Sequence, residues 1–134
     1  MTTSSELFYT TLTALFTGLI WVPIVLNRFA EIGLWKTLMN PERGAQPRAD
    51  WAYRLKAAHR NAIENLVVFA PLAITVHVLQ LGTAGTALAA AIFFYARVAH
   101  AVVYAFGLPI LRTIAFVAGF AVEVFLAGRI LGWF

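Results

Sequence analysis

Residues 86–106 have the sequence TALAAAIFFYARVAHAVVYAF, an almost unbroken apolar run in which Arg97 is the one fully charged residue. About 20 helical residues at ~1.5 Å each cross the ~30 Å hydrocarbon core of a bilayer, and this run has that length. Its richness in alanine and its lack of period-2 alternation argue against a barrel strand. Glycine and proline turns bound it at residues 82–85 and 107–109. The stretch therefore predicts a membrane-spanning α-helix.

Three more apolar runs of spanning length lie at about residues 7–35, 53–81 and 109–134. Pro109 suits the first turn of the last helix, and Asp50 is expected to cap the start of the second. The one long polar segment separates the first two runs. We therefore predict an all-α integral membrane four-helix bundle, a single transmembrane domain over residues 1–134, with helices at about 5–35, 53–81, 85–106 and 109–133.

The composition also indicates a membrane protein. Of the 134 residues, 61% are hydrophobic and 12% are charged, against about 25% charged in a typical soluble domain; the mean hydropathy is +0.79. Lipid must therefore cover part of the surface. The chain has no cysteine, which excludes a disulfide framework, a thiolate metal site and a cysteine nucleophile. The N-terminus lacks the basic region of a secretory signal, so the first apolar run is expected to remain as a span.

The basic residues gather toward one side of the predicted bundle. The loop after the first span and the turn after the third must share a side, and eight basic residues fall toward it: Arg28, Lys36, Arg43, Arg48, Arg54, Lys56, Arg60 and Arg112. By the positive-inside tendency, this side is predicted to be cytoplasmic and both termini to lie outside. The clustering, with a formal charge of +4, favours membrane topology and anionic ligands over nucleic acid.

Several polar residues fall inside the predicted spans, where charges are costly and indicate function by default. Arg60 and Glu64 stand one turn apart on one helix face, with Asn61 beside them. On the third helix, Arg97, His100 and Tyr104 also share a face. Arg112 and Glu123 fall on a common face of the fourth helix. Together these side chains predict a polar wedge that opens toward the basic side.

Two interpretations of this wedge stay open. Charges within a bundle can pair and simply lock the helices together, as Arg97 would with Glu64 or Glu123. The surplus of cations and donors argues for a ligand, since too many remain to be neutralised internally: Arg28, Arg60, His100, Tyr104 and Arg112. Such a set favours an anionic ligand that binds from the basic side.

Four motifs in order carry a resemblance to a known family. They are Asn40-Pro-Glu42, Ala58-His-Arg-Asn-Ala-Ile-Glu-Asn65, Arg97-Val-Ala-His-Ala-Val-Val-Tyr104 and Gly107-Leu-Pro-Ile-Leu-Arg-Thr113. With this spacing the chain resembles the MAPEG family (membrane-associated proteins in eicosanoid and glutathione metabolism), and its short connections resemble the family's bacterial branch. One departure is Ala57, which stands where animal members carry another arginine.

The resemblance implies a homotrimer of four-helix protomers in a bacterial inner membrane, with glutathione bound between neighbours near the cytoplasmic face. Eight positions match the glutathione site: Asn27, Arg28, Arg60, Asn61, Glu64, Arg97, His100 and Tyr104. Arg112 matches the arginine that stabilises the thiolate, and Thr113 stands where some members carry a serine. No metal is implied.

The resulting hypothesis is a glutathione-dependent transferase or peroxidase that acts on apolar electrophiles or lipid hydroperoxides. Its expected partners are glutathione, an apolar or lipid substrate and membrane lipids, and not nucleic acid. Two alternatives stay open. One is a non-catalytic membrane protein that binds glutathione or another anionic metabolite. The other is a small transporter, although such carriers usually hold a membrane-embedded carboxylate on the first helix, where only Glu6 and Glu31 stand, both near helix ends.

Overall fold

The computed structural model describes residues 3–134 and is helical throughout, with no strand among them. Six helices follow one another: α1 (Ser5–Leu19), α2 (Trp21–Ile32), α3 (Leu34–Leu38), α4 (Asp50–Val78), α5 (Ala84–Ala105) and α6 (Pro109–Leu131). Four segments are long and apolar enough to cross a membrane, namely Ser5–Ile32, which joins α1 and α2, and the helices α4, α5 and α6. The all-helical content and the four spanning segments confirm the predicted all-α membrane bundle.

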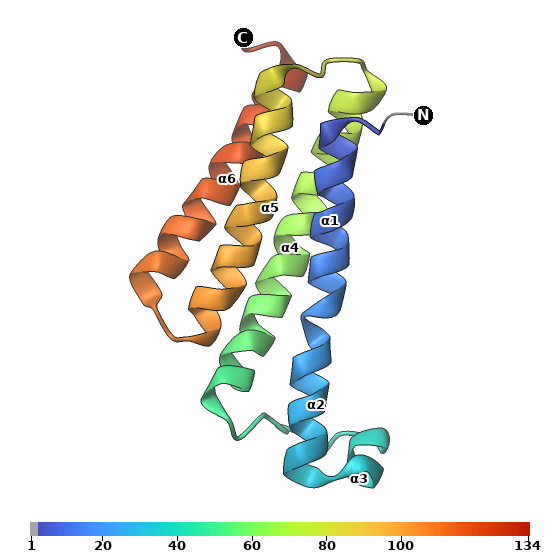
Figure 1. The fold of residues 1–134 in the computed structure, drawn as a ribbon, viewed down its shortest axis with the longest axis vertical. Helices are drawn as coiled ribbons and strands as arrows, with labels where there is room; N and C mark the ends of the chain where they lie inside the picture. Colours follow the sequence, from blue (N-terminus) through green and yellow to red (C-terminus); the bar gives the residue numbers. More distant parts are fainter. Residues whose placement is uncertain (1–2) are drawn as a thin grey trace.

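The first span is two helices rather than one. Pro23 has no N–H to donate to the carbonyl of Leu19, and its ring crowds that carbonyl. The helix is accordingly interrupted at Ile20, between α1 and α2. The predicted continuous helix of residues 5–35 also ends early, because Gly33 adopts φ 83° and stops α2 at Ile32. The short helix α3 then turns away from the end of α2 (Figure 1).

The start of α4 is held by a residue distant in sequence. Asp50 was expected as the N-cap but is the first helical residue, and the N-cap is Ala49, which has no capping side chain. Glu31 takes this role from the end of α2. Its carboxylate accepts hydrogen bonds from the backbone N–H of Arg48 at 3.0 Å and of Ala49 at 2.9 Å. The negative charge also complements the helix dipole at the N-terminus of α4.

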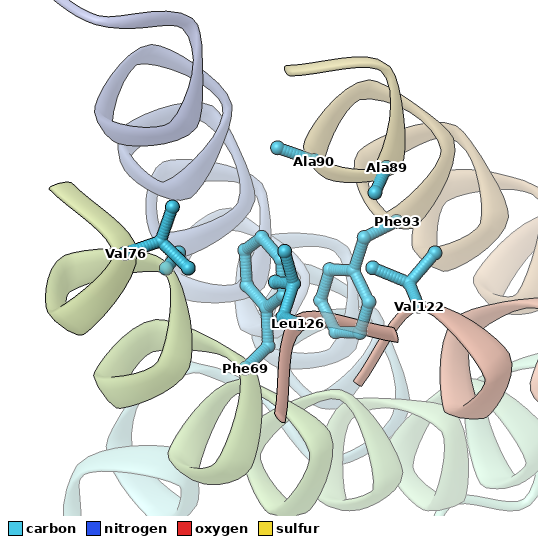
Figure 2. Packing of buried hydrophobic residues seen from close by; sticks show 8 residues of the cluster. Phe69, Val76, Ala89, Ala90, Phe93, Val122 and Leu126 are labelled. Atoms are coloured by element: carbon cyan, nitrogen blue, oxygen red, sulfur yellow. The ribbon is translucent and has the colours of Figure 1, made fainter. Parts of the chain in front are cut away.

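The helices form an elongated bundle in which α1 begins and α6 ends at the same end (Figure 1). The main core lies where α4, α5 and α6 meet. Phe69 and Phe93 stack with ring centroids 3.8 Å apart, and Leu126 packs beside them (Figure 2). Buried Ala73 and Ala90 let the helix backbones come close, as is common in membrane bundles.

The outer surface is apolar over most of its length. Large hydrophobic side chains more than half exposed include Leu15, Val67, Leu88, Tyr95, Ile114 and Phe120. Exposure on this scale along every spanning helix far exceeds what a soluble monomer shows. Lipid is the solvent that such a surface fits.

Candidate functional site

Arg97 is the centre of a polar cluster where α4, α5 and α6 meet. Its side chain is 1% exposed. Nη1 donates to Asn61 Oδ1 of α4 at 3.1 Å, and Nη2 donates to the carbonyl of Ala115 in α6 at 3.1 Å. The guanidinium also lies 5.6 Å from the ring centroid of Phe93 and 5.8 Å from that of Phe116. One α5 side chain therefore joins three helices.

Gly119 makes room for this guanidinium. A Cβ atom at Gly119 would stand 2.8 Å from Arg97 Nη2, closer than real Cβ contacts come. The role of Gly119 was not predicted from the sequence. The available signal was a glycine in the middle of an apolar span, which often marks a close approach between helices.

The hydrogen bonds of Arg97 go to neutral partners, not to the carboxylates proposed as ion-pair partners. Glu64 is exposed on α4, and Glu123 is 6% exposed on α6. Within residues 3–134, neither Arg97 Nε nor Glu123 Oε1 has a hydrogen-bond partner. Orphaned buried polar atoms are rare in native proteins, since each costs about 1–3 kcal/mol. The cluster thus locks helices and still leaves hydrogen-bonding capacity unused.

Three further predicted residues lie together toward the α5–α6 turn. The buried ring of His100 meets the ring of Tyr104 edge to face, with centroids 5.5 Å apart. The guanidinium of Arg112 lies 4.4 Å from the centroid of Tyr104. A cation over an aromatic face is an attractive arrangement, so Tyr104 orients Arg112. The structure therefore brings Arg97, His100, Tyr104 and Arg112 to one region of the α5–α6 pair.

Other predicted residues do not join this group within the described protomer. Arg60 and Glu64 are exposed on the outer face of α4. Thr113 is exposed on α6, and its hydroxyl donates to the carbonyl of Pro109 at 3.0 Å. Asn27 and Arg28 line a different cavity beside α2 and α3, where Asn27 Nδ2 donates to Glu31 Oε1 at 2.8 Å.

No group of three or more His, Cys, Asp and Glu side chains that could hold a metal occurs among residues 3–134. Guanidinium groups and aromatic or imidazole rings predominate where α5 meets α6, together with the carboxylate of Glu123, and guanidinium donors suit an anionic ligand.

The architecture and the ordered motifs agree with one comparison. A sequence model described as the MAPEG family matches residues 7–132, nearly the whole chain. The chain belongs to the MAPEG family. Membership gives this MAPEG protein a glutathione-related membrane function in general terms, in keeping with its four spans. Among curated proteins and among solved structures, no match was found.

Proposed function

We propose that this MAPEG protein is a membrane glutathione transferase or peroxidase, with Arg112 stabilising the thiolate of glutathione. The observation that carries the proposal is the placement of Arg112 over Tyr104, beside buried His100. A guanidinium oriented by an aromatic face presents fixed N–H donors to a sulfur anion. Such a neighbour lowers a thiol pKa from the free value of about 8.5, and the thiolate is the reactive form.

In the transferase reaction, the thiolate attacks an electrophilic carbon, a sulfur–carbon bond forms and the leaving group departs with its electron pair. In the peroxidase reaction, two glutathione thiols are oxidised to one disulfide while a lipid hydroperoxide is reduced to an alcohol and water. An apolar groove of about 320 Å³ between α1, α4 and α5 offers the second substrate a route from the bilayer. Only apolar side chains line it, among them Phe16, Leu55 and Ala101.

The remaining groups would hold the peptide. Arg60 would bind a glutathione carboxylate, and Glu64 would accept from its ammonium group. Arg97 would act chiefly by orienting Asn61, because both of its Nη atoms are already hydrogen-bonded. His100 and Tyr104 would position the peptide rather than act as a base. Thr113 would have a minor role beside Arg112, since its hydroxyl already donates to a backbone carbonyl.

The exposed face of α4 supports a homotrimer. Arg60 and Glu64 are exposed within a spanning helix. A charge that faces lipid near the membrane centre costs about 2.5–3.5 kcal/mol on insertion scales. A second copy that covers this face would remove that cost and bring its own Asn27 and Arg28 to the same glutathione. In this assembly the site opens on the cytoplasmic side of a bacterial inner membrane, and both termini lie outside.

A second candidate is a non-catalytic MAPEG protein that binds glutathione or another anionic metabolite. The hydroxyl of Thr113 favours this candidate, because it already donates to the Pro109 carbonyl. Thr113 therefore does not add a second hydrogen-bond donor, beside Arg112, for a thiolate. The transporter alternative has less support. The carboxylate of Glu6 is buried and hydrogen-bonded to Thr86, and the carboxylate of Glu31 accepts from backbone amides of the loop. Both carboxylates are therefore already occupied and do not line a transport path.

The experiment is an ultraviolet difference spectrum of the purified, detergent-solubilised protein titrated with glutathione. A saturable thiolate band is expected in the wild type and in Arg43→Ala, whose arginine lies exposed on the loop. Arg112→Ala should lose the band and retain much of the binding seen by calorimetry. Binding without a band in the wild type would favour the non-catalytic candidate. Absence of both band and binding would refute the proposed function.

A further inference from the structure

A separate polar cavity lies away from the cluster around Arg97. Its volume is about 530 Å³, and it is enclosed by α2, α3 and the loop that leads into α4. Four cationic side chains line it, against two carboxylates: Arg28, Lys36, Arg48 and Lys56 face Glu31 and Glu42. The cavity is therefore electropositive.

One of these carboxylates, that of Glu31, holds the wall of the cavity together. Glu31 accepts from Asn27 Nδ2 and from the backbone N–H groups of Arg48 and Ala49, which fixes the loop against α2. Lys56 Nζ donates to Gln46 Oε1 at 3.1 Å. In contrast, the side chains of Arg28, Lys36 and Arg48 make no hydrogen bond within residues 3–134. Three cations consequently remain available to a ligand.

The helix α3 indicates the depth of this cavity relative to a membrane. Four apolar side chains of α3 and its C-cap are exposed, with Trp35 the most exposed at 73%: Leu34, Trp35, Leu38 and Met39. A short helix with exposed tryptophan and leucine beside a lysine is typical of the membrane–water interface. From this pattern we infer that the cavity opens at the level of the lipid phosphates.

We propose that this cavity binds a phosphate-bearing ligand, with the phosphate held by Lys36 and Arg48. Phosphate oxygens match the fork of an arginine and the point charge of a lysine. Either an anionic phospholipid headgroup or a soluble phosphate compound would supply this chemistry. The proposal does not depend on glutathione chemistry. Lys36 and Arg48 are outside the glutathione site proposed above, so their variants report on the cavity alone.

The first test uses native mass spectrometry of the full chain in detergent, with equal amounts of phosphatidylglycerol and phosphatidylcholine added. Selective retention of phosphatidylglycerol is expected. Arg48→Gln and Lys36→Gln should each weaken it about fivefold, the effect of about one cation at an anionic surface. Arg43→Gln removes a charge from the same loop without touching the cavity and should change nothing. Helical circular dichroism confirms that each variant is folded.

The second test is calorimetry with inorganic phosphate and with glycerol phosphate. Binding of these probes that is lost in Arg48→Gln, without lipid selectivity, would support the proposal with a soluble ligand as the source. The proposal is overturned if neither lipid nor phosphate binds, or if Arg43→Gln weakens binding as much as Arg48→Gln.

Discussion

Two polar clusters inside the bundle, one around Glu6 and one around Arg97, differ in whether their buried polar atoms all have hydrogen-bond partners. Near the end where α1 begins, Glu6 is 5% exposed and accepts from Thr86 Oγ1 at 2.6 Å. Thr86 and Thr83 in turn form a reciprocal capping box at the start of α5. At the Arg97 cluster, by contrast, Arg97 Nε and Glu123 Oε1 have no partner within the described chain.

The contrast distinguishes a hydrogen-bonded cluster that is complete within the protomer from one that is not. The Glu6 cluster joins α1 to α5 and uses the groups that it buries, so it needs no ligand. The Arg97 cluster joins three helices as well, but it adds cations beyond the neutral partners that hold it. A buried polar network that is fully satisfied gives rigidity, whereas an unsatisfied one is costly unless something else completes it. We therefore expect the two clusters to respond differently to mutation.

The largest effect is expected for Arg97→Ala. It removes the bonds to Asn61 and to the Ala115 carbonyl and takes away the guanidinium charge that acts on buried Glu123. A hydrogen bond from a charged donor contributes about 1.5–3 kcal/mol, so the loss of two should cost at least about 3 kcal/mol. Unfolding in detergent, followed by circular dichroism, measures the loss, and glutathione binding should disappear with it. Stability equal to the wild type would mean that Arg97 is not a structural centre.

A smaller effect is expected from filling the space beside Arg97. Gly119→Ala would place a methyl group 2.8 Å from Nη2 and force the guanidinium to move, at a cost of about 2 kcal/mol. The matched control is Gly82→Ala in the other cluster, where the added Cβ would stand 3.3 Å from Glu6 Oε1. At 3.3 Å the carboxylate needs to move by only a few tenths of an ångström, so the control should lose clearly less stability. If thermal unfolding gave the same loss of stability for Gly119→Ala and Gly82→Ala, the predicted difference between the two clusters would be wrong.

The smallest effect on glutathione binding is expected for Thr86→Val, which keeps the side-chain shape and removes the hydroxyl bonded to Glu6. Loss of this bond and of the bond from the Thr83 N–H leaves a buried carboxylate without its donor and should cost about 1–3 kcal/mol of stability. Glutathione titration should give the same affinity as the wild type, because this cluster serves structure alone. Thr86→Ser retains the hydroxyl and should restore stability. A change in glutathione affinity would show that the Glu6 cluster is coupled to the site.

The sequence was sufficient to predict the four spans, since runs of apolar residues of spanning length depend on composition alone. It also placed Arg97, His100 and Tyr104 on one helix face, which helical periodicity determines. It did not predict that Arg97 bonds Asn61 instead of a carboxylate. Several acceptors lie within reach of a long arginine, and only the packed positions of the helices select among them.

The exposure of Glu64 was beyond prediction for a related reason. In water, an apolar stripe reveals which face of a helix points inward. In a membrane both the core and the surroundings are apolar, so the pattern does not fix the rotation of α4 about its axis. The break at Ile20 and the Glu31 cap were missed because each depends on a local contact: Pro23 with the preceding turn, and a carboxylate with a loop distant in sequence.

The Glu31 contact has a mechanical consequence. The segment α2 continues from α1 through the buried Ile20, packs against α4, and is joined to the start of α4 by the Glu31 hydrogen bonds. Asn27 and Arg28 lie on α2 between Ile20 and Glu31. Loss of the Glu31 hydrogen bonds would therefore loosen the loop that faces α2, and with it the wall of the cavity that Asn27 and Arg28 line.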